Sequence, residues 1–259
     1  MAVDSHALSS RYEFKYRVAE GLLSEIRAFL KPFVQPDSYA RLHPDNRYCI
    51  STLYLDSPAL DLYRSTANGE RHRFKLRIRS YSELPSDPVY LEVKERIDQV
   101  IRKERCKVPR STAVEFLRNG CSVGSRGDAT TYASFSLLAR QIGARPILWV
   151  RYQREAYQAA APEPLRITFD TVLQHRIPPP FHPILESGRD GWQATPCQGA
   201  IVEIKFTGRF PSFALDLVRQ MNLIRTSVPK YLMCVESSSL LQTRRHAVVH
   251  HRALEERRS

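Results

Sequence analysis

Ten consecutive residues, HRFKLRIRSY at His72–Tyr81, form the segment with the clearest chemical meaning. Successive side chains of a strand point to opposite faces, so four cations share one face: Arg73, Lys75, Arg77 and Arg79. Like charges in such a row repel one another unless water or an anion lies over them. Neighbouring cations on this face would be about 7 Å apart, which suits an extended polyanion with a charge on every unit. The segment therefore predicts a groove that binds a phosphate chain.

Other segments must position this strand, and most of them alternate between apolar and charged residues in the same way. Strands are predicted at residues 12–18, 48–56, 89–95, 100–108, 146–157, 165–172 and 200–207. Helical spacing of apolar residues predicts helices at 20–33, 58–67, 112–117, 134–142 and 213–224. Residues 177–197, with three consecutive prolines, are expected to be irregular.

The charged faces of these strands carry more cations than acids. Their members are Lys15, Arg77, Arg79, Glu92, Lys94, Lys103, Arg105, Arg154, Arg166, Asp170, Glu203 and Lys205. An antiparallel sheet with one solvated face could produce such a pattern on any single strand. Over several strands, however, a solvated exterior would also contain Thr, Ser and Gln. A barrel whose interior is lined with basic residues explains the excess of cations better.

Composition limits the class of protein. The 259 residues carry a net charge of +12 with a pI near 9.7, which indicates an acidic partner such as nucleic acid, lipid or a polyphosphorylated molecule. The mean hydropathy of -0.38 and the lack of a long apolar run exclude a transmembrane helix, and no signal peptide is recognised. Five cysteines without a CxxC pair argue against a disulfide framework or zinc site, so a reducing, cytoplasmic location is expected.

One elaborated domain is expected at residues 1–236, because no repeat or linker divides this part of the chain. Residues 237–259 form a basic tail without a sustained apolar face and are expected to be a surface helix or disordered. Neither GxxxxGK[ST] nor GxGxxG is present, which excludes the common phosphate-loop and dinucleotide-binding motifs.

Eight short motifs occur in an order that resembles the VTC domain, named for the vacuolar transporter chaperone complex. They are EFKY at 13–16, KLRIRSY at 75–81, LEVK at 91–94, RKERCKVP at 102–109, RYQREAY at 151–157, RITFD at 166–170, VEIKF at 202–206 and PKY at 229–231. That family is the polyphosphate-polymerase branch of the CYTH-like triphosphate tunnel metalloenzymes. The resemblance covers residues 12–236. One departure is Pro229, which stands where the family often has a serine.

The resemblance implies an α+β fold: an antiparallel eight-stranded β-barrel, the triphosphate tunnel, with flanking helices. The implied substrate-binding residues are Lys15, Arg77, Arg79, Lys94, Lys103, Arg154, Arg166, Lys205 and Lys230. The implied catalytic residues are Arg77, Arg79, Lys94, Arg154, Arg166 and Glu203. Glu203 matches the family's metal ligand, for Mn²⁺ or Mg²⁺. Glu92 and Asp170 are expected to be supporting acids, and Arg105 fits the pattern without an assigned role.

The activity implied by the resemblance is that of a polyphosphate polymerase, which transfers the γ-phosphate of ATP to a growing polyphosphate chain. A hydrolase of inorganic triphosphate or polyphosphate on the same tunnel is an alternative, since water would only replace the phosphate acceptor. A non-catalytic polyanion-binding module is the third hypothesis. Nucleic acid is not the expected partner, because the cations alternate with apolar residues instead of forming an exposed patch with aromatic platforms. Any translocation of the product would need a membrane-protein partner, and the oligomeric state stays open.

Overall fold

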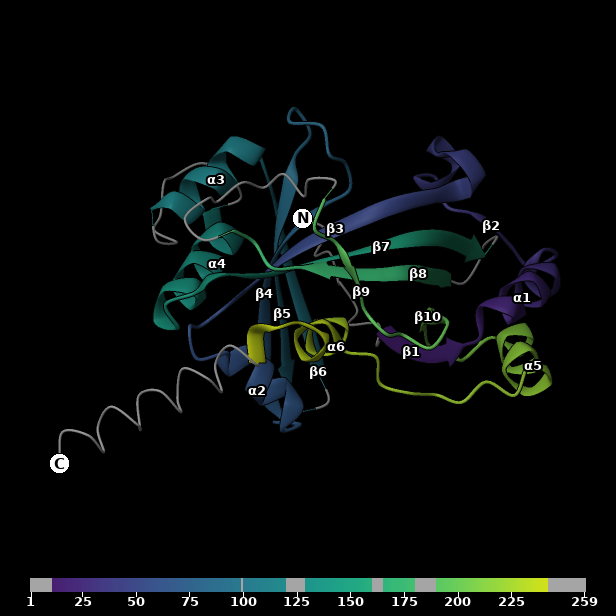
Figure 1. Ribbon diagram of the computed structural model, residues 1–259. Coiled ribbons are helices and arrows are strands. Elements are labelled where there is room, and N and C mark those ends of the chain that lie inside the picture. The colour runs from purple at the N-terminus through teal and green to yellow at the C-terminus, as the bar shows by residue number, and fades with distance from the viewer. Residues whose placement is uncertain (1–10, 99, 120–128, 160–164, 180–189, 242–259) are drawn as a thin grey trace, which may run out of the picture. The chain divides into compact units, whose positions relative to one another are not determined.

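The computed structural model describes residues 11–98, 100–119, 129–159, 165–179 and 190–241 (Figure 1). Its main feature is an antiparallel sheet with the strand order β1-β10-β8-β7-β3-β4-β5-β6. These strands are β1 (Arg11–Val18), β3 (Arg47–Asp56), β4 (His72–Ser80), β5 (Val89–Ile97), β6 (Val100–Val108), β7 (Arg145–Ala159), β8 (Arg166–Arg176) and β10 (Ala200–Thr207). Two short strands, β2 (Val34–Pro36) and β9 (Gln193–Ala194), pair with β7 and β8.

Six α-helices accompany the sheet in the described part of the chain: α1 (Leu23–Leu30), α2 (Asp61–Ala67), α3 (Arg110–Arg118), α4 (Ala129–Gln141), α5 (Ser212–Gln220) and α6 (Lys230–Ser237). Three short 3₁₀ helices are η1 (Glu20–Leu22), η2 (Ala40–Leu42) and η3 (Pro44–Asn46). The predicted α+β class with eight antiparallel strands is confirmed. The sheet is not closed, because no described pairing joins β1 to β6, so "barrel" describes it only loosely.

The chain forms two compact units. Unit 1 comprises Met1–Tyr48, Gln153–Val172 and Cys197–Val228, and unit 2 comprises Cys49–Tyr152, Leu173–Pro196 and Pro229–Ser259. Strands β3, β7 and β8 each contribute residues to both units. Each unit has its own hydrophobic core.

In unit 1, the apolar side chains of alternating strand positions pack under α1 and α5. Tyr16, Ile167 and Val202 are among the buried members of this core. In the register of the sheet, Lys15 lies opposite Glu203, and Glu203 lies opposite Thr168. Since paired residues point to the same face, the charged residues of these strands share the face opposite the core.

Gly199 allows a close approach of the backbone where β1 ends and β10 begins in unit 1. Its φ is +86°, and a Cβ atom there would lie 1.9 Å from the carbonyl oxygen of Val18. Only glycine fits such a position without backbone movement. The local fit keeps Val18 paired with Ala200 and so supports the register that places Lys15 beside Glu203.

In unit 2, α3 and α4 cover the apolar face of β5 and β6 (Figure 1). Phe116 of α3 and Phe135 of α4 are both buried there, with ring centroids 5.5 Å apart. The opposite face of β4, β5 and β6 carries the charged residues, as the alternation predicted. Arg77 lies opposite Glu92, which lies opposite Arg105, and Lys94 lies between Lys75 and Lys103 in register.

Some predicted boundaries are wrong. The helix expected at 20–33 is divided into η1 and α1 and ends at Leu30. The helix expected from Pro58 begins at Asp61 and follows Leu60, whose φ is +61°. The sequence patterns did not predict β2 or α6, and the segment expected to be irregular contains β9. The predicted C-terminal tail lies outside the described residues from position 242 onward.

Candidate functional site

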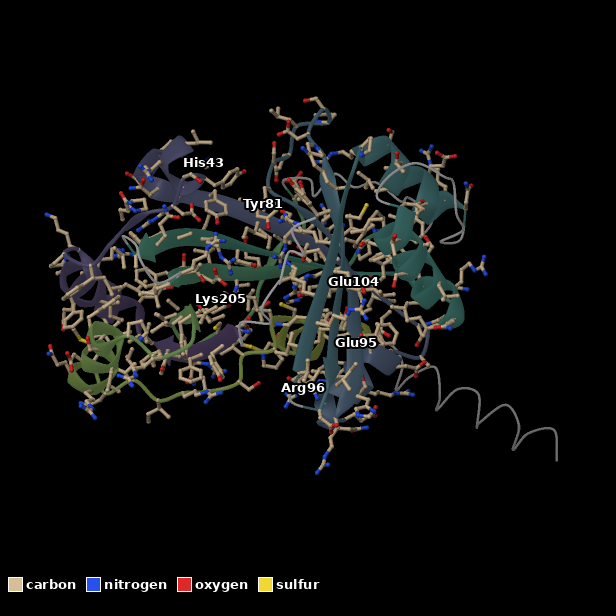
Figure 2. The ribbon with its side chains drawn as sticks, turned by 180° about the vertical axis from the view of Figure 1, so that it is seen from behind. His43, Tyr81, Glu95, Arg96, Glu104 and Lys205 are labelled. Atoms are coloured by element: carbon tan, nitrogen blue, oxygen red, sulfur yellow. The ribbon has the colours of Figure 1, made fainter. Side chains whose placement is uncertain are left out.

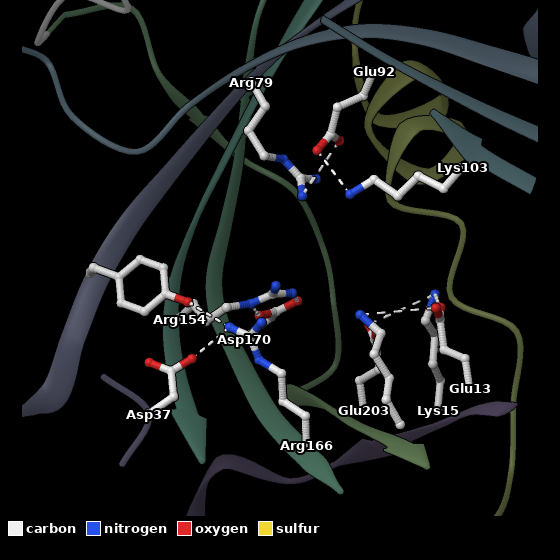
Figure 3. Close-up of polar contacts among 12 residues, drawn as sticks. Glu13, Lys15, Asp37, Arg79, Glu92, Lys103, Arg154, Arg166, Asp170 and Glu203 are labelled. Carbon is white, nitrogen blue, oxygen red and sulfur yellow. Dashed lines mark hydrogen bonds and ion pairs between the residues drawn. The ribbon is translucent and has the colours of Figure 1, made fainter. Parts of the chain in front are cut away.

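Glu92 is the centre of the charged face of unit 2. Its carboxylate is completely buried and contacts four cations. The Nε atom of Arg77 donates to Glu92 Oε2 at 2.7 Å, and Lys103 Nζ lies 2.9 Å from Oε1. An Arg79 guanidinium nitrogen lies 3.7 Å from Oε2, and Arg105 Nε lies 3.3 Å from Oε1. Figure 3 shows Arg79 and Lys103 meeting at the Glu92 carboxylate.

The cations keep Glu92 ionised although it is buried. Burial opposes ionisation, but Arg77, Arg79 and Lys103 outweigh it and hold the pKa of Glu92 well below its usual range. Burial also disfavours the charged form of Lys103 and so lowers its pKa, while Glu92 counteracts this effect. One buried carboxylate therefore aligns several cations that would otherwise repel one another.

Aromatic side chains surround the same cations. The Arg105 guanidinium lies 3.6 Å from the centroid of the Tyr90 ring and 5.3 Å from that of Tyr81. Burial would raise the pKa of the Tyr81 phenol, but Arg79 and Arg105 lower it below its ordinary value. The Nε atom of Arg79 also lies 3.4 Å from the Thr52 hydroxyl, which accepts its hydrogen bond. These contacts limit the rotamers of Arg79 and Arg105 before any ligand binds.

Lys230 lies at the N-terminal end of α6 in the same unit. Its Nζ atom is 4.8 Å from the centroid of the Tyr152 ring, within the range of a cation–π contact. The next residue, Tyr231, is buried, stacks on Tyr54 with centroids 4.6 Å apart and donates a 2.8 Å hydrogen bond to Asp56. The packing of Tyr231 thus determines where α6 presents Lys230.

Two carboxylates and two ammonium groups alternate on the charged face of unit 1. Lys15 Nζ lies 2.7 Å from Glu13 and 4.0 Å from Glu203. Lys205 pairs closely with Glu203 and lies 4.0 Å from Glu13. Burial lowers the pKa of Lys205, whereas Glu203 and Glu13 favour its charged form. Figure 3 shows Glu13, Lys15 and Glu203 together on the neighbouring strands β1 and β10.

Two arginines of unit 1 are each held by an aspartate. Arg154 makes a bidentate pair with Asp170, with hydrogen bonds of 2.6 and 2.7 Å, and both side chains are buried. Arg166 donates to Asp37 Oδ2 at 2.7 Å and to the Tyr48 hydroxyl at 3.3 Å. Paired donors of this kind match carboxylate and phosphate oxygens equally well. Each aspartate therefore fixes the orientation of its guanidinium group.

The residues of unit 1 fit a divalent cation that completes its ligands from a substrate. Glu13 and Glu203 supply hard carboxylate oxygens, and the buried Oγ1 of Thr168, opposite Glu203 in register, has no hydrogen-bond partner among the described residues. Mg²⁺ is commonly bound through one or two carboxylates together with phosphate and water oxygens. Within the described ranges, no group of three or more His, Cys, Asp or Glu side chains could hold a metal ion alone.

The structure distributes the predicted site residues over both units. Unit 1 holds Lys15, Arg154, Arg166, Glu203 and Lys205, and unit 2 holds Arg77, Arg79, Lys94, Lys103 and Lys230. Direct ion pairs link Lys15 and Lys205 to Glu203 in the first set. In the second set, Arg77, Arg79 and Lys103 meet at Glu92.

Several residues that belong to the two charged clusters, or that position them, were not singled out from the sequence. Asp37 lies outside the predicted strands, Asp56 is the last residue of the strand predicted at 48–56, and Tyr231 was noted only within the PKY motif. Glu13 falls on the same strand face as Lys15, two residues away, and this spacing was the available signal for it. Glu92 and Asp170 were expected only as supporting acids, yet each makes the principal ion pairs of its cluster. Arg151 donates a hydrogen bond to Gln174, and its guanidinium group lies over the Trp192 ring, 4.0 Å from the centroid.

No helix in the described part of the chain is both long and apolar enough to cross a bilayer. A sequence profile of the VTC domain matches residues 10–239. A search of curated protein sequences finds no match.

Among solved structures, the chain is similar to a candidate adenylate cyclase from Bacillus halodurans, with 10% identity, a TM-score of 0.48 and coverage of 83% of this chain and 91% of that one. A protein from Pyrococcus horikoshii has 14% identity, a TM-score of 0.43 and coverage of 86% and 97%. A candidate adenylyl cyclase from Hippeastrum, which has a dominant triphosphatase activity, has 13% identity, a TM-score of 0.46 and coverage of 85% and 91%.

Proposed function

Because the chain belongs to the VTC domain family, we propose that it is an ATP-dependent polyphosphate polymerase. In this reaction, a terminal oxygen of a polyphosphate chain attacks the γ-phosphorus of ATP. The bond from that phosphorus to the β–γ bridging oxygen breaks, and ADP leaves. The chain grows by one phosphate, and each cycle presents a new terminal oxygen for the next attack.

The observation that carries the proposal is the cationic face of unit 2. Arg77, Arg79 and Lys103 converge there with their charges aligned by Glu92. Cations on alternate positions of a strand repeat about every 7 Å, so a phosphate chain can contact several of them at once. Phosphoryl transfer depends mainly on positioning and charge neutralisation, and this face supplies both.

The charged face of unit 1 supports the same reaction. Arg154 and Arg166 present guanidinium groups that can neutralise phosphate oxygens. Lys15 and Lys205 alternate with Glu13 and Glu203. A Mn²⁺ or Mg²⁺ ion held by Glu203 and Glu13 would add Lewis-acid polarisation of phosphate oxygens. Asp170 and Asp37 keep the two guanidinium groups oriented throughout.

The test is to incubate the purified protein with ATP and Mn²⁺ or Mg²⁺ and to resolve the products by size on a gel stained for polyphosphate. Chains that lengthen with time, with one ADP formed for each phosphate incorporated, support the proposal. Orthophosphate without chains, from ATP, triphosphate or added polyphosphate, would instead identify a hydrolase. Tight triphosphate binding without turnover would identify a binding module. The Glu203→Gln variant, assayed in parallel, controls for a contaminating kinase.

A further inference from the structure

The end of the β5–β6 hairpin in unit 2 exposes three aliphatic side chains. Ile97 is 45% exposed, Val100 is 67% exposed and Ile101 is 51% exposed. Elsewhere along β5 and β6 the apolar residues are buried, as Val93 and Cys106 are. The hairpin therefore carries apolar side chains beyond the core, where they are exposed to solvent.

These side chains point to both faces of the hairpin. Ile97 pairs with Val100, and Ile101 pairs with Arg96, so Ile101 lies on the face opposite the first pair. A flat protein surface can cover only one of these faces. An apolar medium into which the end of the hairpin inserts would cover both.

Cations surround the same end of the hairpin. Residues 70–73 and 94–105 contain seven Lys or Arg residues and four Asp or Glu residues. Two of the seven cations, Lys103 and Arg105, pair with Glu92, which leaves five cations beside the four acids. Two of these acids are engaged locally: Glu104 pairs with Arg102 at 2.7 Å, and Asp98 lies 3.5 Å from His72. In Figure 2, Arg96 lies nearer than Glu104 to the end of the hairpin. The charge therefore favours an anionic partner.

A second copy of the chain is a poor occupant of this surface. The hairpin's outer strand, β6, ends the strand order. It carries Arg102, Lys103, Arg105 and Lys107. Pairing along β6 between two copies would place these cations against one another, and like charges opposed across strands are destabilising.

We infer that the end of the β5–β6 hairpin, with Ile97, Val100 and Ile101, inserts into the surface of an anionic lipid bilayer. Binding at such interfaces increases with the buried apolar area and with electrostatic attraction to acidic headgroups. The aliphatic side chains enter the boundary between headgroups and acyl chains, while the flanking arginines contact lipid phosphates. This inference does not depend on the proposed polymerase activity.

The test is cosedimentation of the full chain with vesicles of phosphatidylcholine alone or mixed with phosphatidylserine. We expect binding to the mixed vesicles and a loss of about tenfold or more in the Ile97→Ser, Val100→Ser, Ile101→Ser triple variant. Leu42→Ser is the matched control, because Leu42 is 76% exposed but lies in unit 1; its binding should equal that of the unchanged protein. Circular dichroism should show that all variants keep their secondary structure.

A second measurement covers the case in which the triple variant does not fold. Val100→Trp should give a blue shift of indole emission when phosphatidylserine vesicles are added, whereas Leu42→Trp should not. Absence of binding to mixed vesicles, equal binding to both vesicle types, or unchanged binding of a folded triple variant would each overturn the inference. Binding of phosphatidylserine vesicles without a blue shift in Val100→Trp would likewise exclude insertion.

Discussion

The Tyr231 hydroxyl donates a 2.8 Å hydrogen bond to a buried carboxylate oxygen of Asp56. Asp56 also accepts hydrogen bonds from the backbone N–H groups of Ser57, Leu62 and Tyr63 around the first turn of α2. One carboxylate therefore joins the end of β3, the start of α2 and the start of α6. Burial raises the pKa of Asp56, and these hydrogen bonds partly counteract that effect.

We expect Tyr231→Phe to lower the free energy of unfolding by about 1–2 kcal/mol, because a buried carboxylate loses a donor. The ring still stacks on Tyr54, so the packing volume is kept. Urea denaturation measures the change. Tyr12→Phe is the control, since the Tyr12 side chain is 45% exposed and should tolerate the loss of its hydroxyl. Equal stability of the two variants would contradict a structural role for the Asp56 hydrogen bond.

Replacement of Glu92 by Gln should destabilise the protein at neutral pH by about 3 kcal/mol, because the buried cations lose their shared counter-ion. The pKa of Glu92 is depressed in the folded state. Its contribution is therefore present above the unfolded-state pKa of about 4.3 and is lost as the pH falls through the folded pKa. The stability difference between the two proteins should shrink under acid conditions.

Chemical denaturation over a series of pH values measures that difference. Glu25→Gln is a suitable control because Glu25 is exposed on α1. A constant gap between Glu92→Gln and the unchanged protein at all pH values would show that the carboxylate charge does not align the cations.

Substitution of Arg77 and Arg79 by Lys should weaken triphosphate binding by about tenfold or more for each residue, although the net charge is unchanged. Lys cannot reproduce the planar paired donors of a guanidinium group. Titration calorimetry with inorganic triphosphate measures the dissociation constant. Arg151→Lys is the matched control, because Arg151 contacts Gln174 and Trp192 instead. An unchanged dissociation constant in the double variant would contradict the assignment of this face to phosphate binding.

Glu203→Gln should abolish metal-dependent turnover, because an amide oxygen is a much weaker ligand for Mg²⁺ or Mn²⁺ than a carboxylate. Turnover is measured at increasing metal concentrations with saturating ATP. Glu20→Gln, at the exposed start of η1, serves as the control. Full activity of Glu203→Gln at low metal concentration would remove Glu203 from the proposed metal site.

The strands that carry the site were predictable because alternation is a local property of the sequence. Arg77, Glu92 and Glu203 could each be assigned to the charged face of a strand from their immediate neighbours alone. The partner of Arg166 could not, since Asp37 lies 129 positions away and outside any alternating segment. Helix α6 was missed because it is short and its apolar residues do not repeat over enough turns to predict a helix.

Glu92 partly neutralises the cationic face of unit 2 before any phosphate binds. A phosphate that reaches Arg77 and Lys103 does not meet bare cations, because a fixed carboxylate already satisfies them. Binding then adds phosphate charge to cations that are already partly neutralised, and fewer mobile counter-ions are released than the number of cations suggests. The affinity of the protein for polyphosphate should accordingly depend less steeply on salt than that of a flexible polycation with the same number of charges. This partial neutralisation also limits the affinity per phosphate, so that a long chain can move past the cations instead of remaining bound at one position.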